Sequence, residues 1–399
     1  MNILMICHKS PPGAYARSHV MGCQLVRRGH QVTLMLISEK ERWHVHVFDW
    51  DGVKAVETPH LSINRLRYGW DAWNTMSRFI YLSKETQTYN LIHCFETRPA
   101  TIYPALWYAN KHHIPLITDW IDWWGRKGLV EINRPFWYRL LSLKGLETYY
   151  EEAFRAKAAG LTVIATALAE RAIGLGVKPE RICHIPGGTF LDWFKLRSQE
   201  ECRNKMGFPL QIPILGFSSS DSHFDMEIVM GALAIVARKF PSIKLIVTGK
   251  ARKSVHKLVT KCQVQDHVCF VGYVPFDELP WYLGCADLFL LPMLDRPYNR
   301  GRWPNKMGEY LSLGRPTVAN PVGDIKLLFE RHSIGFLAGW EPEDFAEKII
   351  SILNNPQLSS DFGRNARRVA ETEFDWAILA EKLEKFYYEI CKMEIHPPN

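Results

Sequence analysis

The sequence contains no uninterrupted apolar run of about 18 residues or more, which is the length that a membrane-spanning helix needs. It also begins without the basic leader and long apolar core of a signal peptide. The apolar run Ile3–Cys7 is instead expected to form a buried β-strand near the start of the chain. These absences argue against a membrane-spanning protein and against a cleaved leader.

The nine cysteines are an odd number and show no paired CxxC spacing, which argues against a disulfide framework and against a zinc site. A reducing, cytoplasmic location is therefore expected, with no metal. The net charge of +7 is small for 399 residues. It suits anionic ligands or an anionic membrane surface, and we expect no nucleic acid partner.

What the sequence does contain is two series of apolar strands that alternate with helical patterns. The first series begins with Ile3–Cys7 and Val32–Ile37 and continues through Leu91–Phe95, Pro115–Thr118, Leu161–Ile164 and Ile182–Pro186. The second comprises Pro213–Ser218, Lys244–Thr248, Val268–Val271, Leu288–Pro292 and Thr317–Ala319. This alternation predicts an α/β fold with two doubly wound, Rossmann-like parallel sheets.

The polar segment 195–208 is weakly periodic and is predicted to be an interdomain linker. It would separate a first domain, residues 1–194, from a second domain, residues 209–375. The amphipathic stretch Trp376–Cys391 predicts a C-terminal helix within residues 376–399.

The most informative segment runs from Arg300 to Pro316 and follows a predicted strand. Pro304 suits the first position of a helix and Gly314 its end, while Met307, Tyr310 and Leu311 define a buried face. A helix N-terminus beside basic side chains is an anion site, and ligands of open α/β sheets bind beyond the carboxyl ends of strands. The segment therefore predicts a phosphate-binding helix.

The charged residues of this helix allow two interpretations. Lys306 and Glu309 lie three residues apart, with Arg302 just upstream, so the basic groups could bind a diphosphate and the carboxylate a ribose. Alternatively, Lys306 and Glu309 form a surface ion pair. The position after a strand favours the binding site.

A second candidate is the segment from Asp119 to Gly128, in which Asp119 and Asp122 lie among three tryptophans at a strand end. Aromatic rings could stack on a sugar while the carboxylates accept its hydroxyl groups. The alternative is a helix cap formed by Asp119 and tryptophans of the core.

These motifs, in this order, resemble those of the family 4, group 1 glycosyltransferases, which are retaining enzymes of the GT-B fold. The resemblance covers nearly the whole chain. The matching segments are Gly29-His30-Gln31-Val32, Ile185-Pro186-Gly187-Gly188, Phe270-Val271-Gly272-Tyr273-Val274-Pro275, Lys306–Ala319, Pro321-Val322-Gly323-Asp324 and Phe374-Asp375-Trp376. The resemblance implies two domains facing a cleft and a C-terminal helix that crosses back to the first domain.

The resemblance also implies roles for individual residues. Glu309 would hold the ribose hydroxyls of a nucleoside diphosphate sugar, and the residues from Gly272 onward, notably Tyr273 and Val274, would line the base. The loop from Ser10 to Arg17, which contains Gly13, would face the donor phosphates. Asp119 or Asp122 would lie near the reacting centre.

The sequence departs from the family pattern in three places. Gly301 occupies the position of the first of two glutamates, and Ser218–Asp225 lacks the usual arginine and lysine, with only His223 as a possible cation. The first loop carries Gly13-Ala14 in place of a double glycine. We therefore expect the diphosphate charge to be borne by the segment that contains Arg300, Arg302 and Lys306, which with Asp119 and Asp122 are the candidate catalytic and donor-binding residues.

The sequence thus predicts a retaining glycosyltransferase that moves a sugar from a nucleoside diphosphate sugar to a glycan, lipid or small-molecule acceptor. The alternative is a non-catalytic GT-B protein that binds a nucleotide sugar or glycan. Basic and aromatic residues mix in Arg65–Tyr81 and Asn133–Lys144, which suits either helices at an anionic membrane or core aromatics with solvated arginines. Peripheral association with the inner membrane face is one expectation.

Overall fold

The computed structural model describes residues 1–8, 17–61, 68–133, 136, 143–218 and 223–395. The chain divides into two compact units, one formed by Met1–Pro186 with Trp376–Asn399 and the other by Gly187–Asp375. The first unit thus ends at Pro186, whereas the sequence placed the end of the first domain at residue 194. The C-terminal segment joins the first unit, as the family resemblance implies.

The first unit is built on an eight-stranded sheet in the order β3-β4-β2-β1-β5-β6-β7-β8. All pairs in it are parallel except the antiparallel hairpin β3–β4. Its strands are β1 (Asn2–Cys7), β2 (Gln31–Ile37), β3 (His46–Trp50), β4 (Val53–Thr58), β5 (Leu91–Phe95), β6 (Leu116–Trp120), β7 (Gly160–Val163) and β8 (Ile182–His184). Its helices are α1 (Arg17–Arg27), α2 (Ala72–Lys84), α3 (Pro99–His112), α4 (Val130–Asn133), α6 (Leu143–Glu152), α7 (Thr166–Gly174), η2 (Pro179–Arg181) and α17 (Trp376–Ile395).

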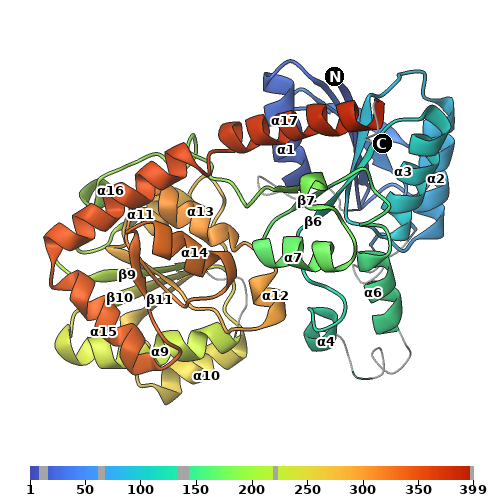
Figure 1. The fold of residues 1–399 in the computed structure, drawn as a ribbon. Coiled ribbons are helices and arrows are strands. Elements are labelled where there is room, and N and C mark those ends of the chain that lie inside the picture. The colour runs from blue at the N-terminus through green and yellow to red at the C-terminus, as the bar shows by residue number, and fades with distance from the viewer. Residues whose placement is uncertain (9–16, 62–67, 134–135, 137–142, 219–222, 396–399) are drawn as a thin grey trace. The chain divides into compact units, whose positions relative to one another are not determined.

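The second unit has a six-stranded, all-parallel sheet in the order β11-β10-β9-β12-β13-β14. Strands β9, β10 and β11 of this sheet are labelled in Figure 1, among the helices of the unit. Its strands are β9 (Ile214–Ser218), β10 (Lys244–Thr248), β11 (Val268–Gly272), β12 (Leu288–Leu291), β13 (Thr317–Ala319) and β14 (Gly335–Leu337). Its helices are α8 (Gln199–Met206), α9 (His223–Lys239), α10 (Lys253–Lys261), η3 (Gln265–His267), α11 (Leu279–Gly284), α12 (Pro297–Arg300), α13 (Asn305–Ser312), α14 (Gly323–Arg331), α15 (Pro342–Leu353) and α16 (Pro356–Thr372). This strand order reverses between β9 and β12, which is the Rossmann arrangement.

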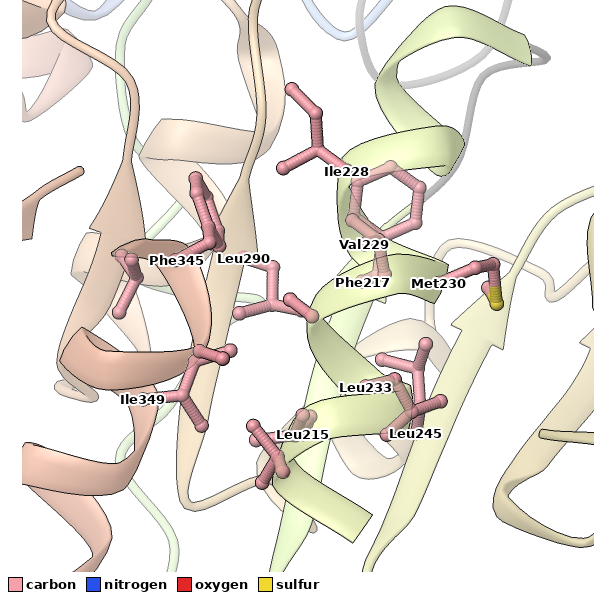
Figure 2. Packing of buried hydrophobic residues seen from close by; sticks show 14 of the residues in the cluster. Leu215, Phe217, Ile228, Val229, Met230, Leu233, Leu245, Leu290, Phe345 and Ile349 are labelled. Atoms are coloured by element: carbon pink, nitrogen blue, oxygen red, sulfur yellow. The ribbon is translucent and has the colours of Figure 1, made fainter. Parts of the chain in front are cut away.

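Both sheets are covered by helices, which is why their strands are continuous apolar runs instead of alternating ones. In β1, Leu4 and Ile6 belong to the buried cluster with α2 and α3, while Met5 lies near Gly22 of α1 on the opposite face. In the second unit, α9, α10 and α15 bury one face of the sheet (Figure 2). The side chains of that cluster include Leu215, Phe217, Val229, Leu245, Leu290, Phe345 and Ile349.

The predicted linker 195–208 contains helix α8 and lies within the second unit. Ser198 caps the helix by accepting a hydrogen bond from the Glu201 backbone N–H (3.1 Å), and Gly207 ends it with a positive φ of 72°. The helix is held mainly by polar contacts, since Arg203 donates to Asp287 (2.9 Å). Apolar periodicity is therefore weak in this helix.

No helix in the described part of the chain is both long enough and apolar enough to cross a membrane.

Candidate functional site

The carboxyl ends of β9 and β12 flank the point at which the strand order of the second unit reverses, and α13 is anchored to both strands. The Ser218 backbone N–H donates to the Tyr310 hydroxyl oxygen (2.9 Å), and that hydroxyl donates to the Leu290 carbonyl (3.4 Å). The Tyr310 ring also stacks on Phe289, with centroids 4.1 Å apart. Ligands of such sheets bind at this point, so α13 lies where a nucleotide site is expected.

Lys306 and Glu309 lie on α13, and Arg302 lies in the turn before it. The Lys306 ammonium lies 4.4 Å from the centroid of the Phe217 ring, near the end of β9. The Arg302 Nε is buried and has no hydrogen-bond partner among the described residues. Glu309 is buried, with 7% of its surface exposed. A buried guanidinium N–H without an acceptor is costly, and an incoming anion would satisfy it.

Close packing against α13 explains the Gly187-Gly188 pair of the sequence. A Cβ on Gly308 would lie 2.9 Å from the Gly188 carbonyl oxygen, and one on Gly187 would lie 2.4 Å from the Trp303 ring. Trp303 in turn stacks on Phe374, with centroids 4.9 Å apart. These contacts fix the turn that carries Arg302.

The helix boundaries differ slightly from the prediction. Pro304 is the N-cap residue and α13 begins at Asn305, so Pro304 lies one position earlier than expected. Gly314 has a positive φ of 61° just after the C-cap, as the sequence indicates. Met307, Tyr310 and Leu311 are fully buried, which confirms the predicted buried face.

Arg300 and Gly301 end the short helix α12. The Arg300 guanidinium donates two hydrogen bonds to the Asp295 carboxylate, at 2.5 and 2.6 Å, and the Arg300 side chain is 55% exposed. Gly301 is the buried C-cap of α12. Arg300 is therefore already paired with a carboxylate, whereas the Arg302 Nε has no partner in the described part of the chain.

The predicted base-binding residues follow β11, two strands from β9. Gly272 has a positive φ of 72°, and its carbonyl accepts a hydrogen bond from the Gly249 backbone N–H (2.6 Å). Tyr273 is 77% exposed and Val274 is half-buried. Two strand spacings amount to about 10 Å, a separation that an extended nucleotide can span.

In the first unit, Asp119 is fully buried near the end of β6. It receives hydrogen bonds from Arg17 Nε (2.9 Å) and Nη2 (3.2 Å) and from the Thr162 hydroxyl (2.5 Å). Burial alone would raise the pKa of the Asp119 carboxyl, but the Arg17 charge, His93 and these hydrogen bonds hold it below its ordinary value. Asp119 thus neither caps a helix nor offers an open carboxylate, and the geometry favours a role in positioning Arg17.

The loop that follows β6 is shaped by Glu151 of α6. One Glu151 oxygen accepts from the Trp120 indole N–H (3.0 Å) and the Trp124 backbone N–H (2.8 Å), and the other accepts from the Gly125 N–H (2.5 Å). Asp122 is half-buried within this loop. The loop therefore has one fixed shape.

The tryptophans of this loop already have partners. The Arg171 guanidinium lies over the rings of Trp120 (5.0 Å) and Trp123 (4.4 Å), and the Arg98 guanidinium lies over Trp124 (5.4 Å). These cation–π contacts support the structural alternative for the aromatic cluster.

His93 of β5 is buried between the Tyr387 hydroxyl (2.6 Å) and the Thr162 hydroxyl (3.0 Å), which gives it a structural role. Gly13 lies outside the described residues. The sequence did not indicate that Arg17 pairs with Asp119, or that Glu151 binds the loop after β6. These residues lie far apart in the chain, and no local pattern links them.

Two family models match the chain. The one described as glycosyl transferase 4-like domain matches residues 13–188, and the one described as glycosyl transferases group 1 matches residues 198–369. Among curated relatives, a GDP-mannose-dependent alpha-(1-6)-phosphatidylinositol monomannoside mannosyltransferase of Mycobacterium tuberculosis is 26% identical over 212 residues. That match covers 51% of this chain and 54% of the relative. A D-inositol 3-phosphate glycosyltransferase of Catenulispora acidiphila is 25% identical over 225 residues, and this match covers 53% of this chain and 51% of the relative. The chain thus matches about half the length of these curated relatives.

Solved structures resemble the whole chain. A sucrose-phosphate synthase from Thermosynechococcus elongatus superposes with a TM-score of 0.74 at 18% identity, covering 98% of each chain. The Anabaena protein HepE in complex with UDP and glucose superposes with a TM-score of 0.72 at 16% identity, covering 98% of this chain and 100% of HepE. At these identities the likeness shows the fold alone. Together with the two family models, which match most of the chain, it shows that the chain belongs to the group 1, family 4-like glycosyltransferases of the GT-B fold.

Proposed function

We propose that the chain is a retaining glycosyltransferase whose second unit binds a nucleoside diphosphate sugar. Arg302 and Lys306 would hold the diphosphate, and Glu309 would accept hydrogen bonds from the ribose hydroxyls. Tyr273 and Val274 would line the base. The observation that supports the proposal is the anchoring of α13 to β9 and β12, with the Lys306 ammonium 4.4 Å from the Phe217 ring near the end of β9 and Arg302 in the turn before the helix.

The chemistry asked of these residues is charge stabilisation. In a retaining transfer, the bond between the anomeric carbon and the leaving diphosphate oxygen breaks, and the acceptor oxygen attaches on the same face. The acceptor proton passes to the leaving diphosphate, so no protein nucleophile is required. Arg302 and Lys306 would stabilise the charge that develops on the leaving group. We propose that the reaction needs no metal, so transfer should not depend on added Mg²⁺ or Mn²⁺.

The first experiment is equilibrium binding of nucleoside diphosphates with different bases to the full chain. We expect at least one to bind saturably and Lys306→Ala to weaken it by about ten- to a hundredfold, the range of a lost charge-assisted hydrogen bond. Lys326→Ala is the matched control, since Lys326 belongs to the same unit and makes an exposed pair with Glu330 (3.7 Å). Unchanged affinity in Lys306→Ala would show that Lys306 does not hold the diphosphate.

The second experiment measures transfer. Nucleotide sugars that bind would be incubated with glycan and lipid-linked acceptors, and the anomeric configuration of any product would be determined by NMR. We expect retention. The curated relatives named for phosphatidylinositol mannoside support a lipid-linked acceptor, and HepE with UDP and glucose supports a sugar nucleotide donor. An inverted product would contradict the proposed reaction.

The surface that could contact a membrane is smaller than the sequence suggested. Arg78 of α2 was expected among solvated or lipid-facing basic residues, but it is fully buried and donates to the Cys7 and Ala100 carbonyls (2.6 and 2.8 Å). Besides Ser83 and Lys84 at its end, α2 exposes two large apolar residues one helical turn apart, Met76 (54%) and Ile80 (44%). Most of the predicted basic segment Asn133–Lys144 lies outside the described residues. Flotation with anionic liposomes tests the proposal, and no flotation at low salt would dismiss it.

The alternative function, a non-catalytic protein that binds a nucleotide sugar, is favoured by Gly301. A glycine there supplies no carboxylate to contact the donor sugar. Tight nucleotide binding without transfer or donor hydrolysis would establish this alternative, whereas turnover would exclude it.

A further inference from the structure

A cluster of three side chains in the first unit has the composition of a metal site. His19 and Cys23 lie one turn apart on α1, and Asp51 lies at the tip of the β3–β4 hairpin. The His19 Nε2 is 3.2 Å from the Cys23 Sγ and 3.4 Å from an Asp51 carboxylate oxygen. All three donor atoms lie within 4.8 Å of one another. Imidazole, thiolate and carboxylate are the three ligand types that Zn²⁺ accepts.

The elements that carry these ligands hold them in place. Trp50 and Val53 are paired across the hairpin, and the turn residues Asp51 and Gly52 have φ values of 54° and 85°. Two positive φ values in a two-residue loop are the mark of a type I′ turn, which fixes the direction of the Asp51 side chain. The His19 ring is stacked on the Trp50 ring at 3.5 Å. Thus the imidazole is held by stacking, and the turn places the Asp51 backbone beside it.

Hydrogen bonding alone does not account for this cluster well. The His19 Nε2 faces the Cys23 Sγ, the Asp51 carboxylate and the Trp50 carbonyl (3.3 Å). A neutral ring nitrogen carries either one proton or one lone pair, so it can make only one of these contacts a good hydrogen bond at a time. A cation would be bonded by the nitrogen, sulfur and oxygen together.

The separations suit such a cation. With Zn–N and Zn–O bonds of about 2.1 Å, tetrahedral nitrogen and oxygen ligands lie about 3.4 Å apart, and the longer Zn–S bond gives about 3.6 Å for nitrogen and sulfur. The observed nitrogen–oxygen distance of 3.4 Å matches, the nitrogen–sulfur distance of 3.2 Å is slightly shorter, and the sulfur–oxygen distance is within 4.8 Å. Solvent reaches the site from one side, because the Asp51 side chain is 71% exposed whereas His19 is buried. Water could therefore occupy a fourth position.

We propose that His19, Cys23 and Asp51 bind one divalent cation of the zinc type and thereby tie α1 to the β3–β4 hairpin. The cation would displace the thiol proton, so binding one Zn²⁺ releases that proton to solvent. The sequence indicated no metal because it lacks CxxC pairs. A site assembled from two residues four apart on a helix and one hairpin tip shows no such pattern.

The test uses the full chain without a histidine tag, stripped with a chelator and titrated with Zn²⁺ and Co²⁺. We expect one Zn²⁺ per chain, a raised unfolding temperature with Zn²⁺, and a thiolate-to-cobalt charge-transfer band with Co²⁺. Cys23→Ser should abolish that band. Asp51→Asn keeps the turn, since Asn tolerates a positive φ, and should weaken Zn²⁺ binding by about tenfold or more.

The matched control is Cys262→Ser, which removes a half-buried cysteine of the second unit and should retain the band. Circular dichroism of each variant separates lost binding from lost folding. The proposal is overturned if the wild-type chain shows no saturable binding, or if Cys23→Ser and the wild type give the same band and the same affinity. Nucleotide binding by the second unit is a separate measurement, so failure of either proposal leaves the other standing.

Discussion

Two arginines, Arg17 in the first unit and Arg302 in the second, have opposite surroundings. In the first unit, Arg17 is 10% exposed and satisfied internally by the Asp119 carboxylate and by the Ile185 and Pro186 carbonyls (2.7 and 3.1 Å). In the second unit, the Arg302 Nε is buried with no acceptor among the described residues. A buried cation that is fully paired holds a fold together, whereas one that lacks an acceptor is suited to a ligand.

This difference separates two carboxylate–cation groups that look alike in the sequence. Asp119 follows an apolar strand and lies among aromatics, and Glu309 follows a basic residue on a helix. Both suggest binding sites. The structure assigns the Asp119 carboxylate to Arg17 and Thr162, while Glu309 lies on the helix anchored at the switch point of the second sheet. Proximity of charge in sequence therefore does not distinguish a ligand site from an internal pair.

The largest expected effect comes from breaking the internal pair. Asp119→Ala leaves the Arg17 guanidinium buried without its carboxylate, which should lower the free energy of unfolding by about 3–5 kcal/mol. Urea denaturation of the full chain measures this. The double variant Arg17→Met/Asp119→Leu should be less destabilised than Asp119→Ala, because it removes both charges. A loss below 1 kcal/mol for Asp119→Ala would mean that the pair does not stabilise the unit.

The next effect is a pH dependence of the free energy of unfolding that comes from His93, a neighbour of the Arg17–Asp119 pair. Burial lowers the pKa of His93 from 6.5 to about 4, so the unfolded chain takes up a proton at higher pH than the folded chain does. The stability contribution of neutral His93 is thus complete above pH 6.5 and is lost as the pH falls toward 4. The change is on the order of 3 kcal/mol, at 1.36 kcal/mol for each pH unit. Urea midpoints between pH 4 and 8 measure it.

His93→Gln is the control for that pH dependence, since it keeps a polar group but removes the titrating ring. Its stability should fall at pH 8 because the bonds to Tyr387 and Thr162 are disturbed, yet it should vary less between pH 6.5 and 4. An equal slope in variant and wild type would exclude His93 as the source.

The sequence predicted the fold well because its signals are local. The apolar runs at Ile3–Cys7 and Leu288–Pro292 correspond to β1 and β12, and Gly314 correctly marked the end of α13. The hairpin β3–β4 was not predicted, although Asp51-Gly52 is a favourable turn pair, because β3 is a short edge strand whose residues are exposed or half-buried and therefore do not form a continuous apolar run.

A sequence pattern can group candidate site residues only where they are neighbours in the chain, and the donor site on α13 stays a prediction. Arg302, Lys306 and Glu309 lie within eight positions, so one helix pattern captured them. The partners of Asp119, namely Arg17 and Thr162, come from distant parts of the chain and meet only when the parallel strands assemble. Arg78 shows the same limit, since its helical context indicated a surface residue whereas tertiary hydrogen bonds bury it.

An intermediate effect is expected from removing the cation that faces a ligand. Arg302→Ala should weaken nucleoside diphosphate binding by about tenfold or more, since charge-assisted hydrogen bonds contribute about 1.5–3 kcal/mol. It should not lower stability as Asp119→Ala does, because no internal acceptor for Nε is lost among the described residues. Calorimetric titration and urea denaturation of the same preparation separate the two quantities. If Arg302→Ala lowers the stability but leaves nucleoside diphosphate affinity unchanged, Arg302 has a structural role instead of a binding role.

The smallest effect is expected at Arg300, which is intermediate between the internally paired Arg17 and the proposed ligand-binding Arg302. Its guanidinium is paired with Asp295, yet it is exposed and only two residues from Arg302. Asp295→Ala should lower stability by less than about 1 kcal/mol, as for other exposed pairs. It also removes a negative charge near the proposed diphosphate, so nucleoside diphosphate affinity should rise by about two- to threefold at low salt and return to the wild-type value at high salt, where charges are screened.

The double variant Asp295→Ala/Arg300→Ala decides whether this gain in affinity depends on Arg300. If the double variant keeps the gain, the removed carboxylate alone accounts for it and Arg300 does not contact the donor; if the gain disappears, Arg300 belongs with Arg302 and Lys306.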